Sequence, residues 1–171
     1  MTAVIEANGL GKRYGRKWAL SECTLAIPAS KVVGLVGPNG AGKTTLLHLS
    51  VGLLRPTAGS IAVLGGRPGA TPDKLARVGF LAQDAPTYAG LSVRDHLRFG
   101  AWMNPSWDTG LAEDRVARLG LDPRQKAGEL SGGQRAQLAL TLAVAKRPEL
   151  LVLDEPLASL DPSPGVSSSR A

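Results

Sequence analysis

Short stretches of alternating apolar and polar residues fill the first thirty positions of the chain. Residues 3–7 and 20–27 alternate in this way, and a basic, glycine-containing segment separates them. A period of two is typical of strands with one buried face. The pattern therefore predicts antiparallel strands, and Pro28 ends them.

Apolar runs and helical patterns then follow each other along the chain. The apolar runs predict strands at 31–36, 60–64, 78–82 and 150–153. Helical patterns and capping signals predict helices at 44–53, 92–99, 108–119 and 132–146, with a short helical turn after Pro72. This order predicts an α/β fold with an N-terminal antiparallel β subdomain and a helical subdomain at about 87–146.

A glycine-rich motif directly follows the apolar run at 31–36. Residues 37–45 match the pattern G-x-x-x-x-G-K-[ST] of a phosphate-binding loop. A strand, a glycine-rich turn and a helix in this order direct backbone N–H groups and a positive helix end at phosphate. We therefore expect a nucleoside triphosphate to contact Gly37, Pro38, Asn39, Gly40, Ala41, Gly42, Lys43, Thr44 and Thr45.

Two later motifs add chemistry to this loop. Asp154 and Glu155 end the apolar run at 150–153, so both lie at the carboxyl edge of the predicted sheet, where open α/β sheets bind ligands. Ser131 and Gln134 have the spacing of a capping box at the start of a predicted helix. The intervening Gly132 and Gly133 keep side chains away from an approaching anion.

With these motifs in this order, the chain resembles the ATP-binding subunit of an ABC transporter from about residue 4 to Asp161. The resemblance implies a RecA-like P-loop NTPase core, with ATP and Mg²⁺ as cofactors. It implies that Lys43 reaches the β- and γ-phosphates and that Thr44 and Asp154 hold Mg²⁺. Glu155 is then the general base that polarises the attacking water.

Three further residues match family positions less specifically. Tyr14 matches the aromatic residue that stacks on adenine, although a half-exposed strand tyrosine has the same pattern. Gln83 matches the glutamine that touches Mg²⁺ in the reaction and senses the membrane partner; a solvated strand end is the alternative. Asp161 matches a residue that orders the opposite site of a dimer, and a plain turn before Pro162 is its alternative.

The resemblance also implies partners. The helix end at Ser131, Gly132, Gly133 and Gln134 contacts the γ-phosphate bound to a second ATP-binding subunit, in a homodimer or heterodimer. A membrane-spanning subunit completes the transporter, so the chain is expected to be cytoplasmic and peripheral on the inner face of the membrane. Residues 102–108 favour a small bacterial exporter. The sequence does not identify the cargo.

Composition narrows the alternatives. A hydrophobic content of 43% suits one domain without disulfides, and there is a single cysteine. The net charge of +6 comes from scattered arginines, so we expect no nucleic-acid partner. No apolar run approaches the ~18 residues that cross a bilayer.

Family-like sequence stops at Asp161, and 162–171 have the composition of a disordered tail. The family continues with a switch histidine and further strands and helices, one of which lies between the strands at 31–36 and 150–153. Without that strand we expect an opened sheet, weak nucleotide binding, little or no hydrolysis and aggregation. We interpret this stop as a truncation of the family's domain, by a frameshift or a premature stop. A natural short form completed by a second chain and a non-functional remnant are the alternatives.

A soluble, non-transport ABC ATPase acting on ribosomes or DNA is the remaining alternative. Such proteins usually carry two ATP-binding domains or a long coiled-coil insertion. Only 47 residues separate Gln83 from Ser131 here, and they contain no heptad run.

Overall fold

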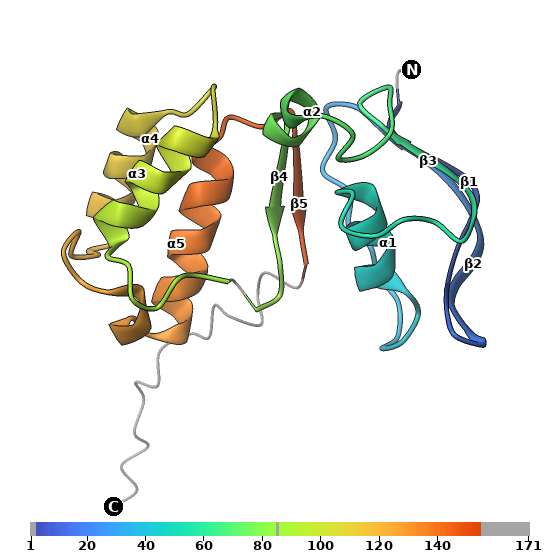
Figure 1. Ribbon diagram of the computed structural model, residues 1–171, viewed down its shortest axis with the longest axis horizontal. Helices are drawn as coiled ribbons and strands as arrows, with labels where there is room; N and C mark the ends of the chain where they lie inside the picture. Colours follow the sequence, from blue (N-terminus) through green and yellow to red (C-terminus); the bar gives the residue numbers. More distant parts are fainter. Residues whose placement is uncertain (1–2, 85, 155–171) are drawn as a thin grey trace, which may run out of the picture.

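The computed structural model describes residues 3–84 and 86–154. Within these ranges, two separate sheets follow one another along the long axis of the molecule, and the helices pack beside them (Figure 1). An antiparallel sheet lies at one end, three longer helices lie at the other, and a parallel strand pair lies between them. The α/β class and the two predicted subdomain types are therefore present.

The antiparallel sheet has the order β2-β1-β3. Its strands are β1 (Ala3–Tyr14), β2 (Lys17–Pro28) and β3 (Ala58–Val63). Inward-facing Ala7 and Leu10 of β1 pack against Leu46 and Leu49 of α1 (Lys43–Ser50). This contact buries the alternating apolar residues and fixes the helix that begins with Lys43 against the sheet.

The second sheet is the parallel pair β4 (Val78–Leu81) and β5 (Leu150–Leu153), in register from Val78 opposite Leu150. Helix α5 (Gly132–Ala145) covers it through Ala136 and Ala139, which pack on Leu81. The short helix α2 (Pro72–Ala76) precedes β4. Both strands match their predicted positions.

Lys146 ties the end of α5 to the start of β4. Its ammonium group donates hydrogen bonds to the carbonyl oxygens of Leu75 and Val78, at 3.0 and 2.8 Å. Burial lowers the pKa of this lysine because the charged form loses water. These two hydrogen bonds fix the position of β4 relative to α5, and Gln83 follows β4 directly.

Among the described residues, three helices and a 3₁₀ turn form the helical part. They are α3 (Val93–Met103), α4 (Thr109–Arg118), η1 (Ala127–Glu129) and α5. Their shared core contains Val93, Val116, Leu121, Ala127, Leu130 and Leu138. Ser92 and Asp95 form the predicted capping box, and the helix that they start runs to Met103, beyond the predicted end at Phe99. No helix within the described ranges has the length and apolar character needed to span a bilayer.

Two sequence predictions near the phosphate loop are wrong. Residues 31–36 form no strand, although their sequence is strongly apolar. A strand requires a neighbour for its N–H and C=O groups, and no described segment makes a backbone hydrogen bond with these residues. Helix α1 ends at Ser50 rather than at residue 53, because Gly52 has a φ of +82° that leaves the helical region.

The unpaired segment 31–36 exposes β-branched side chains. Val32 and Val36 are almost fully solvent-exposed. An apolar, unpaired strand sequence is a template for pairing with another chain. We therefore expect the double variant Val32→Thr/Val36→Thr to form less soluble aggregate than the unmodified chain in size-exclusion chromatography with light scattering.

Leu53→Thr is the control for this prediction. Leu53 is also exposed, but it lies outside the segment. An equal reduction of aggregate by Leu53→Thr would show that general surface hydrophobicity, and not the unpaired segment, drives association.

Candidate nucleotide-binding site

The glycine-rich loop is folded around its own lysine. Lys43 Nζ donates hydrogen bonds to the carbonyl oxygens of Gly37 and Pro38, at 2.7 and 2.9 Å. The amide of Ala41 donates to the same Pro38 oxygen, at 3.2 Å. The loop thus keeps an ammonium group at its centre, directly at the N-terminus of α1, where the helix adds positive potential.

Two glycines give the loop its shape. Gly40 and Gly42 have φ values of +82° and +86°, which side-chain-bearing residues rarely adopt. Gly42 also touches the neighbouring strand, because a Cβ atom there would lie 2.5 Å from the carbonyl oxygen of Ala19 in β2. The start of α1 therefore lies directly against the β1–β2 hairpin.

The acidic strand reaches this loop. Asp154 follows β5 and is buried, with 3% of its surface exposed. Its amide donates to the carbonyl oxygen of Leu81, which continues the pairing of β5 with β4. The Thr44 hydroxyl donates a hydrogen bond of 3.3 Å to Asp154 Oδ1 across 110 positions of sequence. The structure thus brings together two residues that sequence analysis assigned to one metal ion.

Thr44 and Asp154 suit Mg²⁺. A hydroxyl and a carboxylate are the hard oxygen ligands that this ion prefers, and Mg²⁺ in nucleotide sites takes one or two carboxylates plus phosphates and water. Within the described ranges no three His, Cys, Asp or Glu side chains gather into a metal site.

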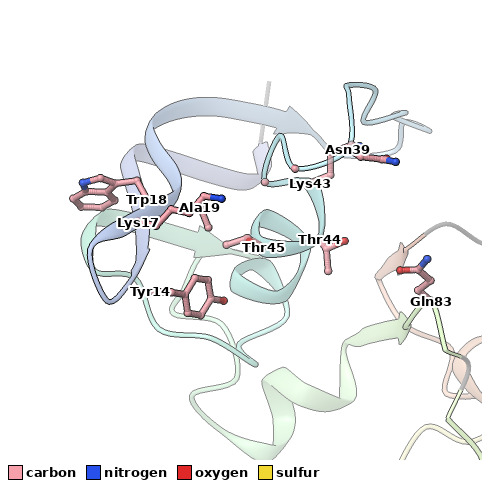
Figure 2. A pocket seen from close by; sticks show the side chains of 11 residues that line it. Tyr14, Lys17, Trp18, Ala19, Asn39, Lys43, Thr44, Thr45 and Gln83 are labelled. Carbon is pink, nitrogen blue, oxygen red and sulfur yellow. The ribbon is translucent and has the colours of Figure 1, made fainter.

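A cavity of about 610 Å³ opens beside the loop (Figure 2). It is lined by Tyr14, Lys17, Trp18, Ala19, Asn39, Gly40, Gly42, Lys43, Thr44, Thr45 and Gln83. Its volume lies in the usual range for small-molecule sites. Tyr14, which is 52% exposed, lies on the hairpin side, and Gln83 lies on the opposite side, beyond Thr44. The cavity thus joins the predicted base-stacking residue to most of the predicted phosphate loop, whereas Gly37, Pro38, Ala41 and Asp154 do not line it.

Sequence analysis missed three lining residues, Lys17, Trp18 and Ala19. All lie on β2, directly after the turn that follows Tyr14. The signal was the short Gly15-Arg16 turn, because a tight hairpin places the start of β2 next to the end of β1.

Other predicted site residues lie outside this cavity. Ser131 and Gln134 form the predicted capping box at the start of α5. The backbone N–H of Gln134 donates to the Ser131 side-chain Oγ, and the backbone N–H of Ser131 donates to the Gln134 side-chain Oε1. A Cβ atom on Gly132 would meet open space, so an anion has room there. None of these residues, nor Gly133, lines the cavity. Glu155 and Asp161, like the predicted tail at 162–171, lie outside the described residues.

The chain is similar to known ATP-binding proteins along most of its length. It is 36% identical over 167 residues to the Fe(3+) ions import ATP-binding protein FbpC 3 of Rhodococcus jostii (strain RHA1), covering 94% of this chain and 48% of that protein. It is 34% identical over 166 residues to the sulfate/thiosulfate import ATP-binding protein CysA of Yersinia pestis, covering 92% and 46%. The chain therefore spans about half the length of these curated relatives.

A solved structure has the same fold. The ATP-binding subunit of an ABC transporter superposes with a TM-score of 0.81 at 25% identity, covering 93% of this chain and 69% of that one. The family model described as ABC transporter matches residues 20–158. This range includes the phosphate loop, helix α1 and the strand that ends at Asp154. The chain belongs to the ABC transporter family.

Proposed function

We propose that this chain binds MgATP in the cavity beside the phosphate loop, as part of an ATP-binding subunit whose ATP hydrolysis drives an ABC transporter. The observation that carries the proposal is the hydrogen bond between Thr44 and Asp154, at the loop that holds Lys43. It joins a phosphate-binding group and a metal-binding carboxylate at one point, as a magnesium triphosphate requires.

Each group has a role in this proposal. Tyr14 stacks on the base, the amides of the loop and Lys43 bind the β- and γ-phosphates, and Thr44 with Asp154 holds Mg²⁺. Mg²⁺, when bound, neutralises charge on the phosphate oxygens. Gln83, at the far side of the cavity, orients water near the γ-phosphate. Glu155, the proposed general base, follows Asp154 in sequence.

Import is favoured over export. Residues 102–108 suggested an exporter, whereas the FbpC and CysA relatives are named import ATP-binding proteins. Those names support an importer subunit. We propose that this subunit works with a second ATP-binding subunit and a membrane-spanning subunit at the cytoplasmic face of the membrane. The family-specific Ser131–Gln134 helix start is the element proposed to meet the partner's nucleotide.

The test is the dependence of ATP affinity on Mg²⁺. In isothermal titration calorimetry we expect Mg²⁺ to tighten ATP binding to the unmodified chain. In Asp154→Asn, Mg²⁺ is expected to raise the affinity for ATP little or not at all, so the variant binds ATP with Mg²⁺ about tenfold more weakly than the unmodified chain does. Its affinity for metal-free ATP is expected to stay the same. Asn has the shape of Asp and still accepts the hydrogen bond from Thr44, so the variant removes charge without creating a hole.

Asp73→Asn is the matched control. Asp73 lies exposed in the first turn of α2, away from the cavity lining, and its change removes the same charge. The proposal is wrong if the unmodified chain binds no ATP, or if Asp154→Asn keeps the full effect of Mg²⁺.

A further inference from the structure

We propose that Lys17 is a second nucleotide-binding lysine, which contacts the ribose and α-phosphate end of the bound nucleotide. The inference rests on the proposed nucleotide site and adds a contact that the phosphate-loop motif does not contain. It comes from the register of the β1–β2 hairpin and from the cavity that the hairpin shares with the loop.

The register places Lys17 beside Tyr14. The two residues are direct cross-strand partners on either side of the Gly15-Arg16 turn. Partners in an antiparallel pair project to the same face of the sheet, with Cβ atoms about 4.5–5.5 Å apart. Both residues line the cavity, and in Figure 2 the Lys17 side chain extends from β2 towards the cavity rather than away from it.

The neighbouring pair faces the other way. Arg13 and Trp18 are also cross-strand partners, and the Arg13 guanidinium lies 5.5 Å from the centre of the Trp18 ring. Because side chains alternate along a strand, this pair belongs to the opposite face. Figure 2 shows the Trp18 ring directed away from Lys43 and Thr44. On the face that carries Tyr14, the hairpin therefore offers the cavity one aromatic ring and one cation, those of Tyr14 and Lys17, whereas Trp18 borders the cavity from the other face.

The Lys17 ammonium group is available for a ligand. Neighbouring Lys12 lies over the Tyr14 ring and donates to the Arg55 carbonyl oxygen, and Lys43 donates inside the loop. The Lys17 ammonium group makes no hydrogen bond or salt bridge to any described residue. A flexible, unpaired ammonium group at the wall of a cavity that receives an anion supplies a charge-assisted hydrogen bond without first breaking one.

The position of Lys17 selects the part of the ligand that it contacts. A nucleotide that stacks its base on Tyr14 and places its terminal phosphates at Lys43 must pass its ribose and α-phosphate between them. Lys17 is next to Tyr14 and is joined to the loop through Ala19, whose carbonyl oxygen closely approaches Gly42. Its contact is therefore with a group that ATP and ADP share.

The experiment compares Lys17→Met with Arg16→Met by calorimetry, using ATP and ADP as ligands. Arg16 is the adjacent turn residue, and it does not line the cavity, so both variants lose one positive charge at nearly the same place. For Lys17→Met we expect the dissociation constants of ATP and ADP to rise by the same factor, about 3- to 10-fold. Arg16→Met is expected to change them by less than about twofold.

Lys17→Arg supplies the rescue, because an arginine keeps the charge and the donors and is expected to retain most of the affinity. The inference is overturned if Lys17→Met and Arg16→Met weaken binding equally, if Lys17→Met has no effect, or if its effect is confined to ATP. Failure of the unmodified chain to bind either nucleotide instead overturns the proposed function itself, so the two failures are distinguishable.

Discussion

The Gly42→Ala variant is expected to lose detectable ATP binding, whereas Gly40→Ala retains a part of it. Both glycines have φ near +85°, so each substitution costs about 1–2 kcal/mol in the left-handed region. Only Gly42 has a second constraint, since its new Cβ atom would lie 2.5 Å from the backbone oxygen of Ala19. A strand carbonyl cannot rotate away, so either the hairpin or the start of α1 must move.

Such a movement would change the distance between the base-stacking and the phosphate-binding residues of the proposed site. The hairpin carries Tyr14, and α1 carries Lys43 and Thr44. The measurement is ATP affinity by calorimetry together with the midpoint of thermal unfolding for both variants. A Cβ atom on Gly40 would meet no atom within 4 Å, so Gly40→Ala isolates the cost of the backbone conformation. Equal affinities of the two variants would contradict the role of the close contact with Ala19.

Local signals in the sequence predicted most of the fold. The alternation in the first thirty residues predicted β1 and β2, and two capping boxes predicted where α3 and α5 begin. These features depend on residues within one turn or one strand, so the sequence contains them directly. The motifs of the phosphate loop and of Asp154 are also short strings, so sequence analysis could propose them as site residues, and the structure joins them through the hydrogen bond between Thr44 and Asp154.

Features that depend on distant partners were not predictable in this way. Residues 31–36 have a strand sequence, but a strand exists only where another segment satisfies its backbone groups, and a local pattern does not reveal whether one is there. The expectation of an opened sheet came from the family resemblance and not from the pattern of these residues. Lys17 was missed because its relation to Tyr14 depends on the register of the hairpin, and its relation to Lys43 depends on how that hairpin packs on α1.

Lys43→Met is expected to weaken ATP binding by about 10- to 150-fold, the equivalent of one charge-assisted hydrogen bond. Lys43 Nζ now donates to the carbonyl oxygens of Gly37 and Pro38, and phosphate oxygens would replace these acceptors. The same bonds hold the loop, so the thermal unfolding of the variant must be measured beside its affinity. Lys31→Met, at an exposed position before the loop, is the control for net charge.

A comparison of ATP with ADP binding distinguishes the proposed contacts of Lys43 and Lys17. Lys43 is proposed to reach the β- and γ-phosphates, so its loss should weaken ATP binding more than ADP binding and reduce the preference for the triphosphate. Loss of Lys17 should weaken both by one factor, because its proposed contact lies at the α-phosphate end. If Lys43→Met weakened ATP no more than Lys31→Met does, the loop lysine would have no specific contact with the nucleotide. If it weakened ATP and ADP equally, its contact would not extend to the γ-phosphate.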